Sequence, residues 1–312
     1  MGKLPRISVI TPSLNQRAFI DATLRSVLEQ GYPDLELWVI DGGSTDGTVE
    51  RLKTYGDALH WISEPDRGQA EAVNKGLARA TGEVIGWLNS DDTYLPGALR
   101  YVGEFFASEP AVDVVYGDAY YVDRQGEVVR PYDTRDFDLT VLAHECFVCQ
   151  PAVFFRRSTL SDVGLLDPGL RVALDYDFWI RLFRKHPPVR LPRFLAASRM
   201  YPENKTLGLR RSAYREIVGT VRKHYGFVPY SWSHGYASYL WYRNDQFHDP
   251  RRASAPVFAL ALLAMAWYNR YNPRYLWNWI VSSRGFRSEL GKARARRPRQ
   301  TASQIARPEG KE

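Results

Sequence analysis

Short apolar segments alternate with amphipathic segments four times in about the first hundred residues. The apolar segments are rich in Val, Ile and Trp, which is typical of buried strands. They cover residues 6–11, 35–40, 59–62 and 83–88. Between them apolar residues recur at helical spacing, as Ile20, Leu24 and Val27 do after the first segment. This order predicts a parallel sheet with helices on both of its faces.

A polar segment follows each of these predicted strands. TPSLNQ comes after the first strand, DGGSTDG after the second, SEPDRGQ after the third and NSDD after the fourth. The carboxyl ends of parallel strands lie along one edge of a sheet, and ligands bind at that edge. The four polar segments therefore predict one shared binding site.

The pattern changes after Asp113. VVYGDAYYVDRQGEVV predicts a hairpin with its turn at 124–126, QPAVFFR at 150–156 predicts a strand, and DYDFWIRLFR at 175–184 predicts a helix. Strand-like segments continue to about Tyr201.

From about residue 207 the chain becomes aromatic, basic and compatible with helices. Its most apolar run, 257–266, is shorter than the roughly 20 residues needed to cross a bilayer. Two interpretations remain. The region is either a helical appendage packed on the preceding domain, or an interfacial pair of helices with Trp and Tyr at the lipid headgroups and Arg facing anionic lipid.

Net charge is concentrated at the end of the chain. The whole chain carries +7, and residues 284–312 hold nine Lys or Arg and three Glu, a net charge of +6. The rest of the chain is therefore nearly neutral. We expect a flexible, solvated tail from about residue 288, with contact to anionic lipid or nucleic acid as the alternative.

The cysteine content and the N-terminal sequence indicate the compartment. Cys146 and Cys149 are too few for a disulfide framework or a four-ligand zinc site, so we expect both to be reduced and near the core. The first residues lack the apolar segment of a secretory signal. We expect a cytoplasmic protein.

Two adjacent carboxylates, Asp91 and Asp92, follow the fourth predicted strand. At ~4 Å and an effective dielectric constant near 20 they repel each other by about 4 kcal/mol, so a cation or a proton is needed between them. Mg²⁺ and Mn²⁺ bind to one or two carboxylates together with substrate phosphate oxygens. The alternative is a helix cap or a surface turn before Pro96.

The second and third polar segments carry further candidate ligands. Asp41 ends a strand and can accept a hydrogen bond from a base or a ribose, unless the segment is a plain turn in which Ser44 caps a helix carrying Val49 and Leu52. The second segment, DGGSTDG, matches neither the dinucleotide fingerprint nor the P-loop. Arg67 can bind a diphosphate with its forked donors, or form a surface ion pair.

Taken together, TPSLNQ, DGGSTDGT, EPDRGQAEAVNKG and GWLNSDD resemble the nucleotide-diphosphosugar half of family 2 glycosyltransferases. QPAVFFRR and LDYDFWIRL resemble that family's acceptor half. The resemblance implies an α/β GT-A nucleotide-diphosphosugar transferase fold, a mainly parallel sheet flanked by helices. It places the catalytic domain at 1–206, with a donor half at about 1–118 and an acceptor half at about 119–206, and leaves 207–312 as a C-terminal helical extension.

The resemblance also implies roles for single residues. Asp92 matches the metal-bound aspartate, and Asp91 would lie against the ribose and the metal, which would be Mn²⁺ or Mg²⁺. Asp175 matches the family's general base, with Asp177 as the alternative because Leu174 replaces an acidic residue. The implied donor-binding residues are Thr11, Pro12, Asn15, Asp41, Ser44, Arg67, Gln69, Asn74 and Asp91. A histidine that many relatives have near Tyr201 is absent, so the metal would depend on aspartate, phosphate and water.

The activity implied is inverting transfer of a sugar from a nucleotide-diphosphosugar to a hydroxyl of a glycan or lipid-linked acceptor, in the synthesis of cell-surface or extracellular polysaccharide. UDP-sugars are favoured as donors over dTDP- and GDP-sugars. We expect a cytoplasmic enzyme, peripheral at the inner face of the cell membrane if the C-terminal region binds anionic lipid, and no nucleic-acid partner.

Two other functions compete with this one. A sugar-1-phosphate nucleotidyltransferase would need a Gly-rich, basic signature near the first strand, which TPSLNQ lacks. A non-enzymatic module that binds membrane or nucleic acid would depend on the basic tail.

Overall fold

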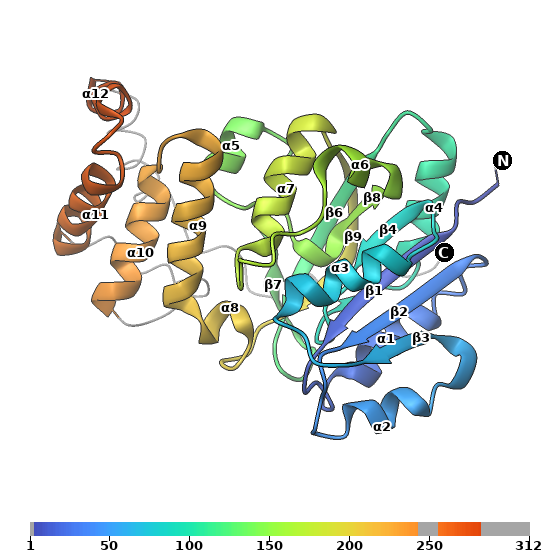
Figure 1. Ribbon diagram of the computed structural model, residues 1–312. Helices are drawn as coiled ribbons and strands as arrows, with labels where there is room; N and C mark the ends of the chain where they lie inside the picture. Colours follow the sequence, from blue (N-terminus) through green and yellow to red (C-terminus); the bar gives the residue numbers. More distant parts are fainter. Residues whose placement is uncertain (1–2, 243–254, 282–312) are drawn as a thin grey trace, which may run out of the picture. The chain divides into compact units, whose positions relative to one another are not determined.

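The computed structural model describes residues 3–242 and 255–281 (Figure 1). These residues form two compact units. The first unit runs to Pro202, apart from residues 143–145, which belong with the second. The site predicted from the sequence lies entirely in the first unit.

Four parallel strands make up half of the sheet in the first unit. The strands and the helices between them are β1 (Ile7–Ser13), α1 (Ile20–Leu28), β2 (Leu35–Asp41), α2 (Thr48–Lys53), the 3-10 turn η1 (Gly56–Ala58), β3 (His60–Ser63), α3 (Gln69–Arg79) and β4 (Val84–Trp87). They lie in the order β3-β2-β1-β4, and each neighbouring pair is parallel. The four strands predicted from the apolar segments are confirmed.

The other half of the sheet is mixed. Its elements are β5 (Thr93–Tyr94), α4 (Ala98–Ser108), β6 (Val114–Val122), β7 (Val128–Pro131), α5 (Leu139–His144), η2 (Gln150–Ala152), β8 (Val153–Arg156), η3 (Arg157–Thr159), α6 (Leu160–Val163), α7 (Leu174–Lys185) and β9 (Val189–Arg199). The order continues from β4 as β8-β6-β9-β5, with β7 paired to β6. Strand β8 is antiparallel to both β4 and β6, whereas β9 is parallel to β6. The predicted β6–β7 hairpin is confirmed.

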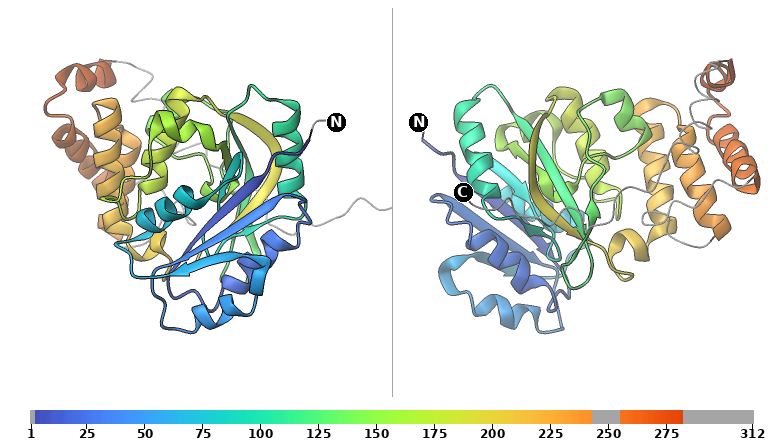
Figure 2. Two further views of the ribbon diagram at one scale, coloured as in Figure 1. Left: turned by 45° about the vertical axis from the view of Figure 1, so that its right-hand side comes forward. Right: turned by 180° about the vertical axis from the view of Figure 1, so that it is seen from behind.

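Helices cover both faces of the sheet, as the alternation of strands and helices predicts. Helices α1 and α4 lie on one face, and α3 and α7 lie on the other (Figures 1 and 2). Side chains alternate between faces along β1, so Val9 packs in the core with α1 and α4. Ile10 faces α3 instead, where Gly76 allows close approach, because a Cβ at Gly76 would lie 2.4 Å from the Ile10 Cγ2.

Aromatic packing fixes helix α7 on the sheet. Trp179 and Phe183 of α7 stack with their ring centroids 5.7 Å apart, and Trp179 also lies 6.2 Å from Trp87 at the end of β4. The Phe178 ring meets Phe155 of β8 edge to face at 5.6 Å. Such pairs add about 0.5–1.5 kcal/mol each beyond the area that they bury. The packing therefore positions the N-terminal turn of α7, which carries Asp175.

The residues described after Pro202, which belong to the second unit, lie mainly in helices, so the predicted C-terminal helical extension is confirmed. Its elements are α8 (Lys205–Gly208), α9 (Arg210–Tyr225), α10 (Tyr230–Tyr242), α11 (Ala255–Tyr268) and α12 (Pro273–Val281). Within the part of the chain that the structure describes, no helix is both long enough and apolar enough to cross a membrane. The assignment of a catalytic domain ending at residue 206, with its two halves, stays a prediction. The predicted flexible tail from residue 288 lies outside the described residues.

Candidate active site

The turns after β1 and β2 join in one hydrogen-bond network. Asp41 is fully buried at the end of β2, and its carboxylate accepts hydrogen bonds from the Ser44 backbone N–H at 2.9 Å and the Ser63 hydroxyl at 2.6 Å. The Ser44 hydroxyl donates to the same carboxylate and accepts from the Asn15 N–H at 2.7 Å. Asn15 closes the network by accepting from the Thr45 N–H at 2.9 Å. The network brings together the predicted residues Asn15, Asp41 and Ser44.

Ser44 does not cap the following helix. Helix α2 begins at Thr48, and the residue before it, Gly47, has the left-handed conformation with φ 92°. The Ser44 hydroxyl instead donates a hydrogen bond to the Asp41 carboxylate. The interpretation of Ser44 as the cap of a helix carrying Val49 and Leu52 is wrong, because the turn is three residues longer than a simple cap requires.

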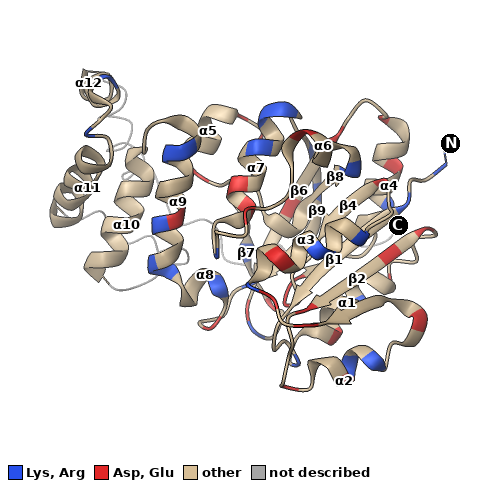
Figure 3. Ribbon diagram, in the orientation of Figure 1, with Lys and Arg blue, Asp and Glu red and all other residues tan. Residues whose placement is uncertain are grey.

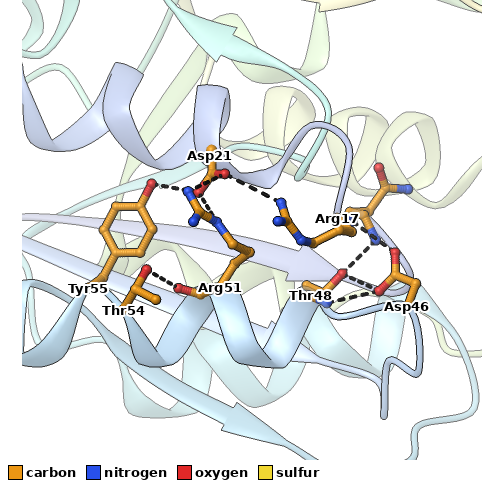
Figure 4. A network of polar contacts seen from close by, with 8 residues as sticks. Arg17, Asp21, Asp46, Thr48, Arg51, Thr54 and Tyr55 are labelled. Carbon is orange, nitrogen blue, oxygen red and sulfur yellow. Dashed lines mark hydrogen bonds and ion pairs between the residues drawn. The ribbon is translucent and has the colours of Figure 1, made fainter.

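A second network braces this turn against α1 (Figure 4). Asp46 accepts hydrogen bonds from the Arg17 N–H at 2.9 Å and the Thr48 N–H at 3.0 Å. Burial acts to raise the pKa of Asp46, but a hydrogen bond from the Thr48 hydroxyl at 2.6 Å and these two backbone hydrogen bonds outweigh it, and the pKa is lowered. Further along α1 and α2, Asp21 and Arg51 form an ion pair at 2.6 Å. The loop therefore keeps its shape without a ligand, which is preorganisation.

Two hydroxyl groups near the end of β1 have no hydrogen-bond partner among the described residues. They are the Thr11 and Ser13 side chains, which are 0% and 4% exposed. The alternation of a strand places both on one face of β1, and Ser13 pairs directly with Asp41 of β2. The predicted Pro12 lies between them, opposite Ile40. Sequence reasoning missed Ser13, although its two-residue spacing from Thr11 was a usable signal.

Three predicted donor residues, Arg67, Gln69 and Asn74, lie in the turn after β3 or in the following helix α3, and only Gln69 is linked to the rest of the site. Gln69 joins the site, since its amide donates to the Asn89 side chain at 2.6 Å. Arg67 is 81% exposed and ion-paired with Glu71 at 2.6 Å, which is its surface alternative. Asn74 donates to the Leu166 carbonyl at 2.9 Å and accepts from the Leu166 N–H at 3.0 Å. In this structure neither Arg67 nor Asn74 is linked to the networks around Asp41 and Asp92.

Asp91 and Asp92 have different surroundings. Asp92 is 4% exposed, and its carboxylate accepts from the Arg199 backbone N–H at 2.8 Å and the Asn89 amide at 3.3 Å. Burial, with the charge of Asp91 as a second cause, raises the pKa of Asp92 well above its usual range. Asp91 is half-buried, and its carboxylate accepts from the Tyr201 hydroxyl at 2.9 Å. Asp91 is therefore the more accessible carboxylate of the pair.

Arg199 at the end of β9 supports both aspartates. Its N–H binds Asp92, its Nε donates to the Asp91 carbonyl at 2.8 Å, and its guanidinium lies 5.1 Å from the centre of the Phe19 ring. Tyr201 packs on the same ring at 4.9 Å. No pattern in the sequence pointed to Arg199, because it lies about a hundred residues after the aspartates.

Asn89 links the turn after β4 to the segment that begins β8. It accepts from the Trp87 indole N–H at 3.0 Å and donates to the Gln150 side chain at 2.9 Å. Gln150 in turn donates to the Trp87 carbonyl at 2.6 Å. The motifs GWLNSDD and QPAVFFRR, separated by about sixty residues, thus meet in one network. Asn89 and Gln150 were not among the predicted site residues.

Asp175 and Asp177 differ in the same way as the first aspartate pair. Asp177 is fully buried and ion-paired with Arg181 at 2.9 Å, and Arg181 also donates to the Leu165 carbonyl at 2.9 Å. Asp175 is half-buried in the first turn of α7. Burial raises the pKa of the Cys149 thiol, and the charges of Asp92 and Asp175 raise it further.

The carboxylates suit a metal that is completed by substrate. Among the residues that the structure describes, no group of three or more His, Cys, Asp and Glu could hold a metal ion alone. Mg²⁺ and Mn²⁺ commonly keep several waters and take one or two carboxylates plus phosphate oxygens. The half-buried Asp91 and the buried Asp92 would supply the one or two carboxylates that such a metal needs.

Comparison with known proteins identifies the family. The family model described as Glycosyl transferase family 2 matches residues 8–164, so the chain belongs to this family and is a glycosyltransferase. The chain is 34% identical over 187 residues to the "PGL/p-HBAD biosynthesis glycosyltransferase" of Mycobacterium tuberculosis, a match that covers 57% of this chain and 70% of the relative.

Solved structures of glycosyltransferases share the fold. Residues 1–349 of S. aureus TarS in complex with UDP-GlcNAc match with a TM-score of 0.61 at 18% identity, covering 93% of this chain and 87% of TarS 1–349. The match spans 53% of the longer TarS chain. The mannosyltransferase PcManGT from Pyrobaculum calidifontis, solved with GDP-Man and Mn²⁺, matches with a TM-score of 0.53 at 21% identity, covering 97% and 79%. The predicted GT-A fold is confirmed.

Proposed function

We propose that this chain is a metal-dependent, inverting glycosyltransferase that moves a sugar from a nucleotide-diphosphosugar to a hydroxyl group of a glycan or a lipid-linked acceptor. The observation that carries the proposal is the convergence of the polar turns after β1, β2 and β4 on the buried Asp41 and the Asp91–Asp92 pair. A UDP-sugar is the favoured donor, since the TarS structure holds UDP-GlcNAc, with dTDP- and GDP-sugars as alternatives. The PcManGT structure, which holds GDP-Man and Mn²⁺, supports the GDP alternative and the metal.

The nucleoside would bind between the turns after β1 and β2. A base or ribose that reaches Thr11 and Ser13 would give their hydroxyls the partners that they lack, and an unpartnered buried hydroxyl costs about 1–3 kcal/mol. Asp41, whose carboxylate is held by Ser44 and Ser63, would accept from the nucleoside without moving. Because this turn is already braced, binding would lose little conformational entropy.

The diphosphate would lie against Asp91. We assign the metal contact to Asp91 first and give Asp92 the role of holding the turn, which reverses the order predicted from the sequence. The support for this order is that both oxygens of Asp92 accept hydrogen bonds from Arg199 and Asn89. A bound Mn²⁺ or Mg²⁺ would neutralise the charge that develops on the leaving diphosphate.

Asp175 would act as the general base. Inversion requires the acceptor oxygen to attack the anomeric carbon from the face opposite the diphosphate while one carboxylate takes the hydroxyl proton. Asp175 is the more accessible carboxylate of the first turn of α7, whereas Asp177 is buried and forms an ion pair with Arg181. Membership of family 2 supports this reaction over a sugar-1-phosphate nucleotidyltransferase and over a purely binding function.

The stereochemistry of sugar release tests the proposal. In the absence of acceptor, water can replace the acceptor hydroxyl, so slow hydrolysis of UDP-GlcNAc, UDP-glucose, GDP-mannose or dTDP-glucose with Mn²⁺ should be observable by proton NMR. We expect the first sugar released to have the anomeric configuration opposite to that of the donor. Release of the same anomer, at times shorter than its mutarotation, would contradict inversion.

A further inference from the structure

Exposed apolar side chains are concentrated in the second unit. Among the described residues, nine of the fifteen large apolar side chains that are exposed lie between residues 240 and 281. They are Leu240, Trp241, Leu260, Leu263, Trp267, Tyr271, Trp277, Ile280 and Val281. Scattered apolar residues are normal on a protein surface, but this concentration on α10, α11 and α12 is of the kind that marks an interaction site.

Helix α11 is apolar on every side. One stripe of it, Val257, Ala261 and Met265, is buried in the small core that it shares with α10. Another stripe, which includes Leu263 and Trp267, faces outward, with these two side chains 69% and 64% exposed. A surface helix of a globular protein ordinarily carries polar residues on its outer face. Packing on α10 therefore accounts for only one side of α11.

An apolar hollow lies between α10 and α11. Its volume is about 320 Å³, and it is lined mainly by large apolar side chains that include Leu240, Leu260, Leu263 and Trp267. These four side chains are also exposed on the surfaces of the helices, whereas Tyr236 and Ala237 form the buried part of the lining. The hollow and the outward stripe of α11 thus form one continuous apolar face, which we call the α10–α11 face.

The charge around this face is basic. The described residues at 226–242 and 255–281 include no Asp or Glu, and Figure 3 shows no acidic residue on α10, α11 or α12. Arg270 follows α11, with its guanidinium 4.3 Å from the centre of the Trp267 ring and 4.5 Å from that of Tyr271. The sequence continues into residues 284–312, whose net charge is +6.

We propose that the α10–α11 face binds to the surface of an anionic lipid bilayer. Leu263 and Trp267 would enter the boundary between headgroups and acyl chains, and Arg270 would meet lipid phosphates, an arrangement in which Trp and Tyr take the headgroup level. A second copy of the chain fits less well, because two basic faces with basic tails repel each other. The inference deepens the proposed function and rests on it for its purpose, which is access to a lipid-linked acceptor.

Vesicle flotation of the full chain tests this inference. Wild-type protein is expected to float with vesicles of phosphatidylcholine and phosphatidylserine, to float less with phosphatidylcholine alone, and to detach as salt rises. The double substitution Leu263→Gln and Trp267→Gln should lower the partition coefficient by at least about tenfold, because two large apolar side chains lose their burial. Substituting Arg270→Gln should reduce the preference for phosphatidylserine.

Matched controls separate the possible failures. Val128→Gln with Val129→Gln changes two exposed apolar residues of β7 in the first unit and should leave flotation unchanged. Calorimetric binding of nucleotide-sugar, measured on the same samples, reports on the donor site independently of lipid. The inference would be overturned if the Leu263–Trp267 variant bound vesicles as well as the wild-type protein does. It would also be overturned if the wild-type protein did not float with vesicles. A wild-type dimer that the variant loses, without any change in flotation, would assign the face to a second copy instead.

Discussion

Each of the two aspartate pairs in the site contains one buried member and one accessible member. Asp92 and Asp177 are 4% and 0% exposed and are held by other side chains or backbone, whereas Asp91 and Asp175 are half-buried. A fully buried carboxylate that is held by hydrogen bonds or an ion pair positions a loop or helix, whereas a carboxylate that is partly exposed can meet a ligand. We therefore expect the members of each pair to respond differently to the same substitution.

Asn substitutions at Asp175 and Asp177 test this difference. Asp175→Asn should lower kcat by about 10²–10⁴-fold, since it removes the base, and should leave donor affinity unchanged. Asp177→Asn should instead lower the free energy of unfolding by about 3–5 kcal/mol, because it leaves Arg181 without its buried ionic partner. Urea unfolding and transfer kinetics on both variants distinguish the two effects. A stable Asp177→Asn enzyme with the larger loss of kcat would exchange their roles.

The sequence predicted which residues at the strand ends belong to the candidate site better than it predicted the residues with which they form hydrogen bonds. Asn15, Asp41 and Ser44 meet as expected from the shared edge of the sheet, because parallel strand ends bring neighbouring turns together. Ser13, Asn89, Gln150, Arg199 and Tyr201 were not predicted as site residues. Arg199 and Gln150 come from distant strands, and a single sequence carries no signal for pairings of that range.

At the scale of elements, the alternation of strand and helix was sufficient for the parallel half of the sheet. All four strands were found, since each has a short apolar run followed by a polar turn. The mixed half was harder. Strand β5 has only two residues, and the parallel pairing of β6 with β9 joins segments more than sixty residues apart. The local pattern of apolar and polar residues predicts strands, but it does not predict which strands pair with each other.

A glycine in α3 sets the distance of that helix from the sheet. Gly76→Ala should destabilise the fold by about 1–3 kcal/mol, because the new methyl group would collide with Ile10 and overpack the core. Gly219→Ala is the matched control on α9, where no atom lies within 4 Å of the new Cβ. This control should stabilise its helix by roughly 0.5–1 kcal/mol. Equal effects of the two substitutions on urea midpoints would show that α3 shifts without cost.

At the scale of the whole molecule, the chain combines a family 2 catalytic fold with a helical extension of different chemistry. The first unit buries its apolar residues under helices on both faces of the sheet, and most of its candidate site residues lie in the turns that follow strands. The second unit leaves an apolar, basic surface exposed. In the proposed function, the nucleotide-sugar would bind to the first unit, and the second unit would bind to the membrane surface that holds a lipid-linked acceptor.

Calorimetric titration of a panel of UDP-, dTDP- and GDP-sugars tests the central claim most directly. The titrations would use wild type with Mn²⁺, wild type with EDTA, and the Asp91→Asn variant, with unfolding curves to establish that each protein is folded. We predict that one nucleotide family binds with Mn²⁺, that EDTA weakens its binding, and that Asp91→Asn removes the dependence on metal. Failure of every nucleotide-sugar to bind to the folded wild-type protein would contradict the donor site.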